Sequence, residues 1–272
     1  MGLPIKLSSR PTREFWEIPV LFEDPELLAL DKPAGLLLAP DPLNLERPSL
    51  MGLLERGIES AAPWAASRGL TFLALTHPLD VGATGVVLLA KSPAVKTELS
   101  RQFAAERARQ CCVALVQGTA AADTFTVEAR LAADPARPEV VRVVPRHGAR
   151  TVTQFTVLER FRDHTLLRCE PRTQREQQIR VHLHSQRLPI AGDPLYGGRP
   201  LLLSRLKPGY RFKPDREELP LLQRVTLHAE ELHCQQPVSG ESLVVRSPWP
   251  KDLNVALKYL RRYAPAPGSA AP

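Results

Sequence analysis

Cysteine is scarce in this chain, and its spacing offers no metal or disulfide motif. The four cysteines are Cys111, Cys112, Cys169 and Cys234, without a CxxC pair or the regular spacing of a disulfide framework. We therefore expect neither a zinc site nor a disulfide-stapled scaffold, and the reducing cytoplasm is the simplest setting. The adjacent Cys111 and Cys112 are expected to be small core residues on a buried strand.

Long apolar runs are also missing. No run approaches the roughly 20 residues of a membrane span, and residues 1–20 lack the apolar core of a signal peptide. We expect a soluble, intracellular protein. Residues 1–15 are expected to form a loose arm, and the proline- and alanine-rich segment 264–272 a disordered tail.

Motifs for common cofactors and nucleophiles are absent as well. The GATG string at residues 82–85 matches neither a P-loop nor GxGxxG, and a strand pattern rather than a helix follows it. His182 and His184 are two residues apart on a predicted helix and so point to opposite sides, which argues against a metal pair. No GxSxG nucleophile motif occurs. We expect no metal in this protein.

Positive charge is in excess. Lysine and arginine number 36 against 29 acidic residues, for a net charge of +7, which favours a polyanionic partner. A cluster of arginines is either an ordinary solvated face or a surface that binds phosphates, and the net charge favours the second interpretation. Its members are Arg142, Arg146, Arg150, Arg160, Arg162, Arg168, Arg172, Arg175 and Arg180.

The pattern of apolar residues predicts an α+β fold. A hairpin-like strand pair is expected over residues 18–38, and a helix opened by Ser92 with Pro93 in its first turn is expected over 92–108. Further strands follow in close order, which suits antiparallel pairing. They are expected at 110–118, 124–131, 139–145, 151–161 and 165–171. We predict a mixed, largely antiparallel sheet with flanking helices.

Helical spacing returns later in the chain. Residues 173–186 predict a helix with a basic face, opened by a capping box of Thr173 and Glu176. Arg175, Gln178 and His182 fall at three- and four-residue steps along it. Asp252 is expected to cap a last helix. We find neither internal repeats nor an interdomain linker.

Four strings, taken together and in order, are more specific than these patterns. EDPELLALDKPAGLLL, THPLDVGATGVVLLAKS, QQIRVHLHSQRLPIAGDPLYGG and LHAEELHCQQPVSGE resemble the RluA-type pseudouridine synthases, and the resemblance covers residues 18–252. It implies a pseudouridine synthase catalytic domain, expected over residues 16–263, that isomerises uridines in ribosomal or transfer RNA without a cofactor. We expect a monomer without an N-terminal S4 RNA-binding domain.

The same resemblance implies the site residues. The family's catalytic aspartate falls on Asp80 in HPLD, and its paired arginine falls on Arg180 in QQIR. Arg175, Gln178 and Cys112 are the expected substrate-binding residues. A carboxylate at the sugar is able to stabilise charge at C1′, attack there or remove a ribose proton, and the sequence leaves these roles open.

Three departures from the family pattern keep a second interpretation open. Pro78 and Val81 stand where arginines are common, and Cys112 stands where a tyrosine stacks on the uracil. Residues 174–177 also differ and bring in the acidic Glu176. An RNA-binding protein with the fold and basic groove but impaired catalysis is therefore the alternative. A glycosidase would need a second carboxylate near these motifs, and none stands out.

Overall fold

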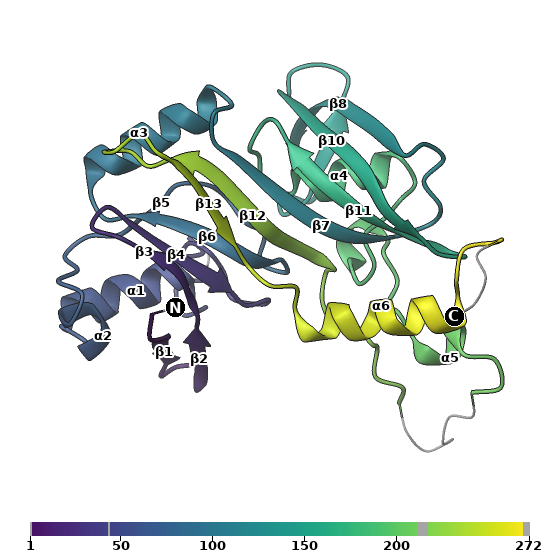
Figure 1. Ribbon diagram of the computed structural model, residues 1–272, viewed down its shortest axis with the longest axis horizontal. Helices are drawn as coiled ribbons and strands as arrows, with labels where there is room; N and C mark the ends of the chain where they lie inside the picture. Colours follow the sequence, from purple (N-terminus) through teal and green to yellow (C-terminus); the bar gives the residue numbers. More distant parts are fainter. Residues whose placement is uncertain (1, 43, 211–216, 269–272) are drawn as a thin grey trace. The chain divides into compact units, whose positions relative to one another are not determined.

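The computed structural model describes residues 2–42, 44–210 and 217–268, which fold into two compact units (Figure 1). The first unit contains Met1–Gln110 and Ala229–Ser247, and the second contains Cys111–His228 and Pro248–Pro272. The chain passes from the first to the second within strand β7 (Arg109–Gln117) and returns within β12 (Leu227–Gln235). The single catalytic domain expected over residues 16–263 stays a prediction.

The first unit is built on sheet strands of which most neighbours pair antiparallel. Their order is β3-β4-β6-β12, with β5 beside β6 and β13 beside β12. The strands are β3 (Val20–Glu23), β4 (Leu27–Lys32), β5 (Ala74–Leu75), β6 (Thr84–Ala90), β12 and β13 (Ser242–Arg246). Every residue of β6 is buried, as expected for a continuous apolar run in the centre of a sheet.

Helix α3 (Pro93–Ala104) covers one face of this sheet. Its Val95 and Leu99 pack against strand residues that include Leu27 and Leu88. The Ser92 hydroxyl accepts the Val95 N–H at 3.3 Å and Pro93 lies in the first turn, so the predicted helix start is confirmed. The other two helices of the unit are α1 (Leu50–Glu59), capped by Ser49, and α2 (Pro63–Ala66).

The N-terminal arm is folded, so the prediction of a loose segment was wrong. Strands β1 (Ile5–Ser9) and β2 (Glu14–Ile18) form an antiparallel hairpin that contacts α1. Ile5 and Leu7 alternate with polar residues, and this period of two places them in the interior at 0% and 4% exposure. The pattern is short, which is why it carried little weight in the sequence.

The strands of the second unit follow the order β7-β11-β10-β8-β9, and each is antiparallel to the next. The strands after β7 are β8 (Thr124–Ala133), β9 (Val141–Val144), β10 (Ala149–Arg160) and β11 (His164–Pro171). This arrangement confirms the predicted α+β class and the antiparallel pairing of the middle of the chain.

Helices lie on both faces of the strands of the second unit. The helical elements are α4 (Gln178–Ser185), the 3₁₀ turn η1 (Pro194–Tyr196), α5 (Leu203–Leu206) and α6 (Lys251–Tyr263). Leu115 and Leu166, paired across β7 and β11, pack with Leu257 of α6. Thr151 and Thr153 of β10 bond instead to α4. Phe155 of β10 pairs with Cys169 of β11, which pairs in turn with Cys112 of β7. Because every second side chain of a strand lies on the same face, Thr151, Thr153 and Cys112 share the face that α4 covers.

Two predicted caps were wrong. Helix α4 begins at Gln178 after Gln177, which has φ 56° and makes no side-chain cap bond. Thr173 accepts the Val152 N–H and donates to Gln178 instead, so tertiary contacts use the hydroxyl that the capping box required. Asp252 lies inside the first turn of α6, and its carboxylate binds Arg224 at 2.8 and 2.9 Å.

The end of the chain is partly described. The Ala264 N–H donates to Leu260 and Pro265 forms an isolated bridge with Phe161, so residues 264–265 are attached to the second unit. The rest of the predicted disordered tail from residue 269 on lies outside the described residues. Within the described ranges, none of the helices combines the length and the apolarity that crossing a membrane requires.

Candidate active site

Asp80 lies half-buried in the loop between β5 and β6. The loop is fastened to β6 by Thr76, whose hydroxyl donates to the Leu88 carbonyl at 2.8 Å. The Asp80 carbonyl accepts the Ala83 N–H at 3.1 Å, which closes a tight turn directly after the carboxylate. The backbone on both sides of Asp80 is therefore fixed.

A buried lysine fixes the residue that follows Asp80. Lys32 is 0% exposed, and its ammonium donates to the carbonyls of Pro33, Leu36 and Val81 at 2.9, 2.9 and 3.2 Å. The Val81 carbonyl also accepts the Gly35 N–H at 2.8 Å. A buried ammonium is tolerated only when its donors are matched, and here three carbonyl acceptors match it.

His77 fixes the residues that precede Asp80. Its Nε2 accepts the Leu88 N–H at 3.1 Å, so the proton belongs on Nδ1, which lies 3.3 Å from the Pro78 carbonyl. Burial lowers the pKa of His77 to about 4, so the ring is neutral near pH 7. Lys32 and His77 were missed as site residues, because only their contacts in the folded chain connect them with Asp80.

Arg180 is held by an acid that the sequence analysis also missed. Its Nε and Nη2 bind Asp193 at 2.7 and 2.8 Å in a bidentate pair, and both side chains are buried. The guanidinium also lies 5.0 Å from the centre of the Tyr196 ring. Asp193 and Tyr196 belong to the GDPLYGG string that contributed to the resemblance, which was their only signal. The predicted pairing of Arg180 with Asp80 stays a prediction.

Helix α4 is attached to β10 by a polar network. His182 bonds to the hydroxyls of Thr151 and Thr153 at 2.8 and 2.9 Å. Thr151 donates to the Ala129 carbonyl, so its oxygen must accept the Nε2 proton of His182, and a neutral ring then accepts the Thr153 hydroxyl at Nδ1. Burial lowers its pKa to about 4, in agreement with that assignment.

Gln178 takes part in the same network. It is 3% exposed, its amide nitrogen donates to Val152 and Thr153, and its oxygen accepts from Thr173. Substrate binding by Gln178 stays a prediction. To bind substrate, the Gln178 amide would have to give up one of these three hydrogen bonds. The expected basic face of α4 is absent, since Gln178, Arg180 and His182 are all buried. Arg175 is exposed and lies before the helix.

Cys112 is buried in β7 at 1% exposure. It lies opposite Cys169 of β11, which is fully buried and whose thiol pKa is raised by burial. These placements agree with the expectation that the paired cysteines are core residues. The substrate-binding role of Cys112 stays a prediction.

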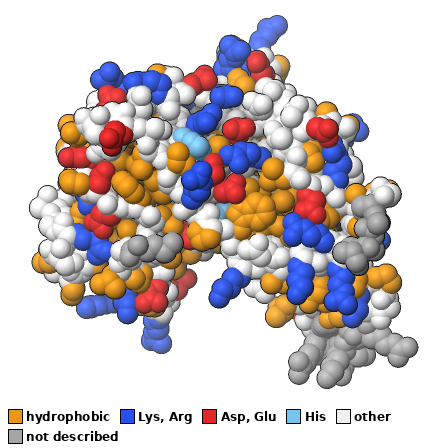
Figure 2. All heavy atoms as spheres, in the orientation of Figure 1, with side chains coloured by type: hydrophobic (Ala, Val, Ile, Leu, Met, Phe, Trp, Pro, Cys, Tyr) orange, Lys and Arg blue, Asp and Glu red, His pale blue; other side chains and the backbone are white. Residues whose placement is uncertain are grey.

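Three members of the arginine cluster pair with acidic side chains. Arg150, Arg160 and Arg162 pair with acids at 2.6–3.1 Å. On the face drawn in Figure 2, basic side chains lie among acidic ones rather than in a field of one sign. The proposed phosphate contacts of this cluster stay a prediction. Its exposed members are Arg142, Arg146, Arg150, Arg162, Arg172 and Arg175.

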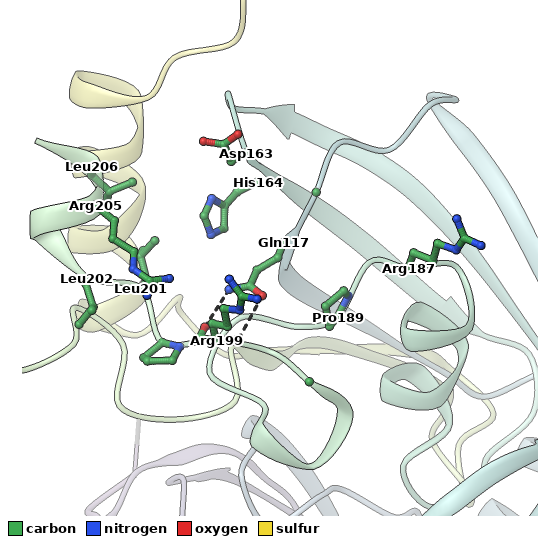
Figure 3. Close-up of a pocket in the computed structure, with 13 residues that line it drawn as sticks. Gln117, Asp163, His164, Arg187, Pro189, Arg199, Leu201, Leu202, Arg205 and Leu206 are labelled. Atoms are coloured by element: carbon green, nitrogen blue, oxygen red, sulfur yellow. Dashed lines mark hydrogen bonds between the residues drawn. The ribbon is translucent and has the colours of Figure 1, made fainter. Parts of the chain in front are cut away.

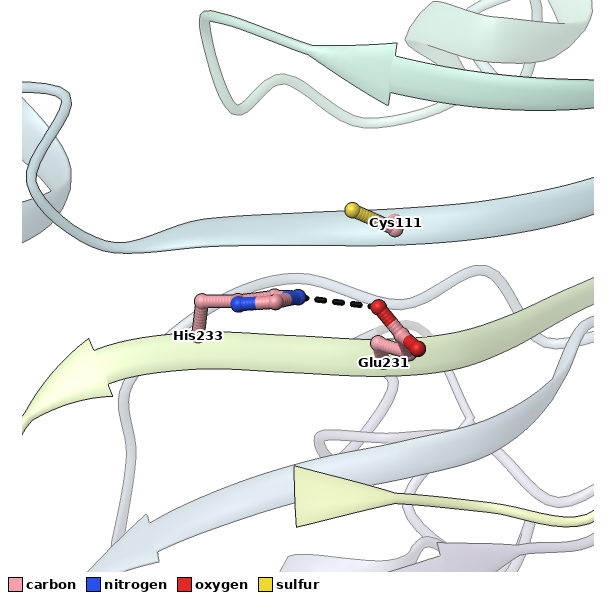
Figure 4. Close-up of side chains that lie close together, drawn as sticks. All are labelled: Cys111, Glu231 and His233. Atoms are coloured by element: carbon pink, nitrogen blue, oxygen red, sulfur yellow. Dashed lines mark hydrogen bonds and ion pairs between the residues drawn. The ribbon is translucent and has the colours of Figure 1, made fainter. Parts of the chain in front are cut away.

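The Glu231 carboxylate on β12 accepts hydrogen bonds from protein side chains. The Glu231 carboxylate binds His233 at 2.9 Å, drawn as the dashed line in Figure 4, and binds Arg246 of β13 with its other oxygen at 2.9 Å. Cys111 on β7, also drawn there, donates its thiol to Glu170 at 3.6 Å. Both oxygens of Glu231 thus have donors within the described chain.

Comparison with known proteins gives consistent results. The RNA pseudouridylate synthase family matches residues 26–185. The ribosomal large subunit pseudouridine synthase D of Xanthomonas campestris is 36% identical over 242 residues, which cover 89% of this chain and 69% of that protein. The enzyme of the same name from Nitrosomonas europaea is 34% identical, over 90% of this chain and 65% of its own length. The chain thus spans about two thirds of these relatives.

The fold comparison points the same way. The human RNA pseudouridylate synthase domain containing 4 superposes with a TM-score of 0.65 at 20% identity, covering 89% of this chain and 92% of that one. Human RNA pseudouridylate synthase domain containing 1 gives a TM-score of 0.62 at 18% identity, over 94% and 97%. These likenesses confirm the predicted fold. By its sequence over most of its length, the chain belongs to the RNA pseudouridine synthase family, isomerases that convert uridine to pseudouridine in RNA.

Proposed function

We propose that this protein isomerises uridine in RNA through the carboxylate of Asp80. The observation that carries the assignment is the fixed backbone around that residue. Lys32 and Gly35 hold the Val81 carbonyl on one side, and His77 holds Pro78 on the other. A catalytic group must be held to within a fraction of an ångström, and buried polar anchors of this kind provide such positioning.

The reaction makes specific demands on this carboxylate. The bond from uracil N1 to ribose C1′ breaks, the base turns while bound, a bond forms from C5 to C1′, and the proton on C5 leaves. A single ionised carboxylate at the sugar serves any of the three roles left open above. We propose that Arg180 keeps Asp80 ionised. The bidentate contact with Asp193 supports this role because it fixes the plane of the guanidinium.

We propose ribosomal RNA of the large subunit as the substrate, with transfer RNA as the second choice. The support is the name shared by the two relatives at 34–36% identity. We further propose that a single chain is sufficient, acts in the cytoplasm and needs neither metal nor cofactor.

The test uses the purified chain and an unmodified transcript of large-subunit ribosomal RNA carrying tritium at C5 of uridine. Tritium release that persists in EDTA would support the assignment, and pseudouridine mapping of the product would name the position. Mapping ribosomal RNA from cells with and without the gene then identifies the natural site. A transcript that keeps all its tritium, together with identical maps, would refute the proposal.

An RNA-binding role without catalysis remains the second candidate. The observation that favours it is the burial of Cys112, at 1% exposure, at the position where the family's stacking tyrosine is expected. A thiol does not replace a stacked ring, which in single-strand binding contributes roughly 1–3 kcal/mol per base. Binding of the transcript without tritium release would select this candidate.

A further inference from the structure

The second unit contains an open cavity of about 470 Å³ that the proposed chemistry does not use (Figure 3). The ends of β7 and β11, the segments that follow α4 and η1, and helix α5 line it. Its volume falls within the roughly 300–1,000 Å³ of small-molecule pockets. The residues that matter below are Gln117, His164, Arg187, Arg199, Arg205 and the neighbouring leucines and prolines.

A buried histidine faces this cavity without a partner. His164 opens β11 and is 9% exposed, and neither ring nitrogen finds a hydrogen-bond partner among the described residues. Buried polar side chains are nearly always hydrogen-bonded, so an unsatisfied imidazole calls for an explanation. In Figure 3 the ring projects into the space that Arg199 and Arg205 border. A bound acceptor would satisfy its N–H.

The cavity has a surplus of positive charge. Arg187, Arg199 and Arg205 are exposed, and none makes an ion pair within the described part of the chain. The acid on the rim, Asp163, is paired with Arg162 at 3.1 Å. Glu218 adds negative charge near Arg205 and accepts the Ser204 N–H at 2.8 Å. In Figure 3 the Arg187 side chain points away from this space, which leaves Arg199 and Arg205 against one unpaired acid and favours an anionic ligand.

One of these arginines has a fixed backbone. The Gln117 amide donates to the Arg199 carbonyl at 3.0 Å and accepts the Arg199 N–H at 3.1 Å, shown as dashed lines in Figure 3. The Gly192 N–H donates to the same carbonyl at 3.0 Å. The same loop carries Asp193, the partner of Arg180. Arg199 is thus presented from a rigid base, which lowers the entropic cost of binding.

The remaining wall is apolar. Pro189, Pro200, Leu201, Leu202 and Leu206 complete the lining. An isolated phosphate ion has no use for such a surface, whereas a nucleotide presents both a phosphate and the apolar faces of its sugar and base. The combination of arginines, an imidazole and an apolar wall therefore fits a nucleotide unit better than a free ion.

We propose that this cavity binds one nucleotide of the RNA substrate, other than the target uridine, with its phosphate on Arg199 and Arg205 and a hydrogen bond from His164. The inference rests on the proposed function, since it takes RNA as the ligand. It assigns to the second unit an RNA contact that helps select the region of the transcript presented for modification.

Salt dependence gives a sharp test. Affinity of the full chain for the unmodified ribosomal transcript is measured from low to physiological salt for the unaltered protein and for Arg199→Gln, Arg205→Gln and His164→Phe. Because both arginines hold the same phosphate, each arginine variant should reduce the slope of log affinity against log salt by up to roughly 0.7–0.9, the value for one lost phosphate contact. His164→Phe should lower affinity roughly three- to tenfold and leave the slope unchanged, because a neutral donor is lost.

Lys96→Gln is the matched control, since Lys96 is exposed on α3 and lines none of this cavity. The proposal would be overturned if both arginine variants kept the salt slope of the unaltered protein. It would also be overturned if Lys96→Gln reduced that slope as much as the arginine variants do. Uridine monophosphate supplies a second arm. If the variants weaken its binding but not that of RNA, the cavity is a free-nucleotide site and the proposal fails. If His164→Phe does not fold, the arginine variants decide.

Tritium release measured on the same preparations separates this inference from the proposed function. A protein that releases tritium, but whose cavity variants bind RNA normally, contradicts only the nucleotide site. A protein that releases no tritium, but whose cavity variants lose a phosphate contact, contradicts only the isomerase assignment and leaves the nucleotide site standing.

Discussion

At the scale of single residues, we expect the loop that carries Asp80 to be most sensitive to loss of the buried Lys32 ammonium. Lys32→Met keeps the length of the side chain but removes the ammonium that donates to the carbonyls of Pro33 and Leu36. We expect a loss of about 3 kcal/mol in the free energy of unfolding. Turnover should fall far more than RNA affinity, since the Val81 carbonyl loses one of its two anchors beside Asp80.

Urea unfolding and tritium release measure these two effects. Lys96→Met is the control, because Lys96 is exposed and its replacement should change stability by less than about 0.5 kcal/mol. Equal stability of the Lys32 and Lys96 variants would show that the buried ammonium does not hold the loop.

Two neutral histidines predict sensitivity to acid. The pKa values of His77 and His182 are both lowered to about 4, whereas an unfolded chain titrates near the ordinary value of 6.5. The unfolded state therefore binds more protons between pH 6.5 and pH 4, so stability is complete above pH 6.5 and is lost as the pH falls through this window. At pH 5 the loss should be on the order of 2 kcal/mol for each histidine.

Urea unfolding at pH 7.5 and pH 5 tests the acid effect. His182→Gln should be less stable than the unaltered protein at pH 7.5 but should lose less on acidification, because one of the two titrating rings is gone. A variant with the full pH dependence would mean that His182 titrates normally in the folded state.

Cys112 marks the largest departure from the family at the residue scale. It is 1% exposed and lies opposite Cys169, so Cys112→Tyr inserts an aromatic ring at a buried position of the sheet. We expect the ring to overpack the sheet and to lower stability by roughly 1–3 kcal/mol, together with any tritium release. Tritium release that appears only after tyrosine is introduced would favour a decayed enzyme over an adapted one.

At the scale of elements, helix α4 distinguishes a structural role from a binding role. The Gln178 amide bonds to Val152, Thr153 and Thr173, and the residue is 3% exposed, whereas Arg175 just before the helix is exposed. Gln178→Ala should cost about 2 kcal/mol of stability and leave the RNA affinity of the folded protein unchanged. Arg175→Gln should show the reverse, with weaker binding and unchanged stability.

Unfolding and RNA binding are measured on both variants. If Gln178→Ala binds RNA several-fold more weakly at full stability, the amide contacts substrate as the family resemblance implies. That result would contradict the structural role.

The elements also show what local sequence is able to predict. The start of α3 was predicted because Ser92 and Pro93 act within their own turn. The start of α4 was not, because Thr173 binds Val152 and the side chain of Gln178 rather than the first turn. Arg180 and Asp193 are 13 residues apart in the sequence, with the end of α4 and Pro189 between them. The periodicity of a single helix or strand does not predict such a pair.

At the scale of the whole molecule, the order of the motifs predicted the family and the fold, and both are confirmed. The two compact units were not predicted. The chain crosses between them inside strands β7 and β12 and again after Ser247, and at the two strand crossings no linker composition marks the boundary. The motifs also indicate Asp80 and Arg180 as site residues, and that assignment stays a prediction. The anchors of Asp80 depend on tertiary contacts, and a single sequence does not contain them.

The central claim is that the Asp80 carboxylate performs the isomerisation, and Asp80→Asn tests it most directly. The amide keeps the shape and removes the charge that the chemistry needs. We expect no tritium release above background from the labelled ribosomal transcript, with RNA affinity within a few-fold of the unaltered protein and the same urea midpoint. Near-normal tritium release by the folded Asp80→Asn protein would remove Asp80 from the mechanism.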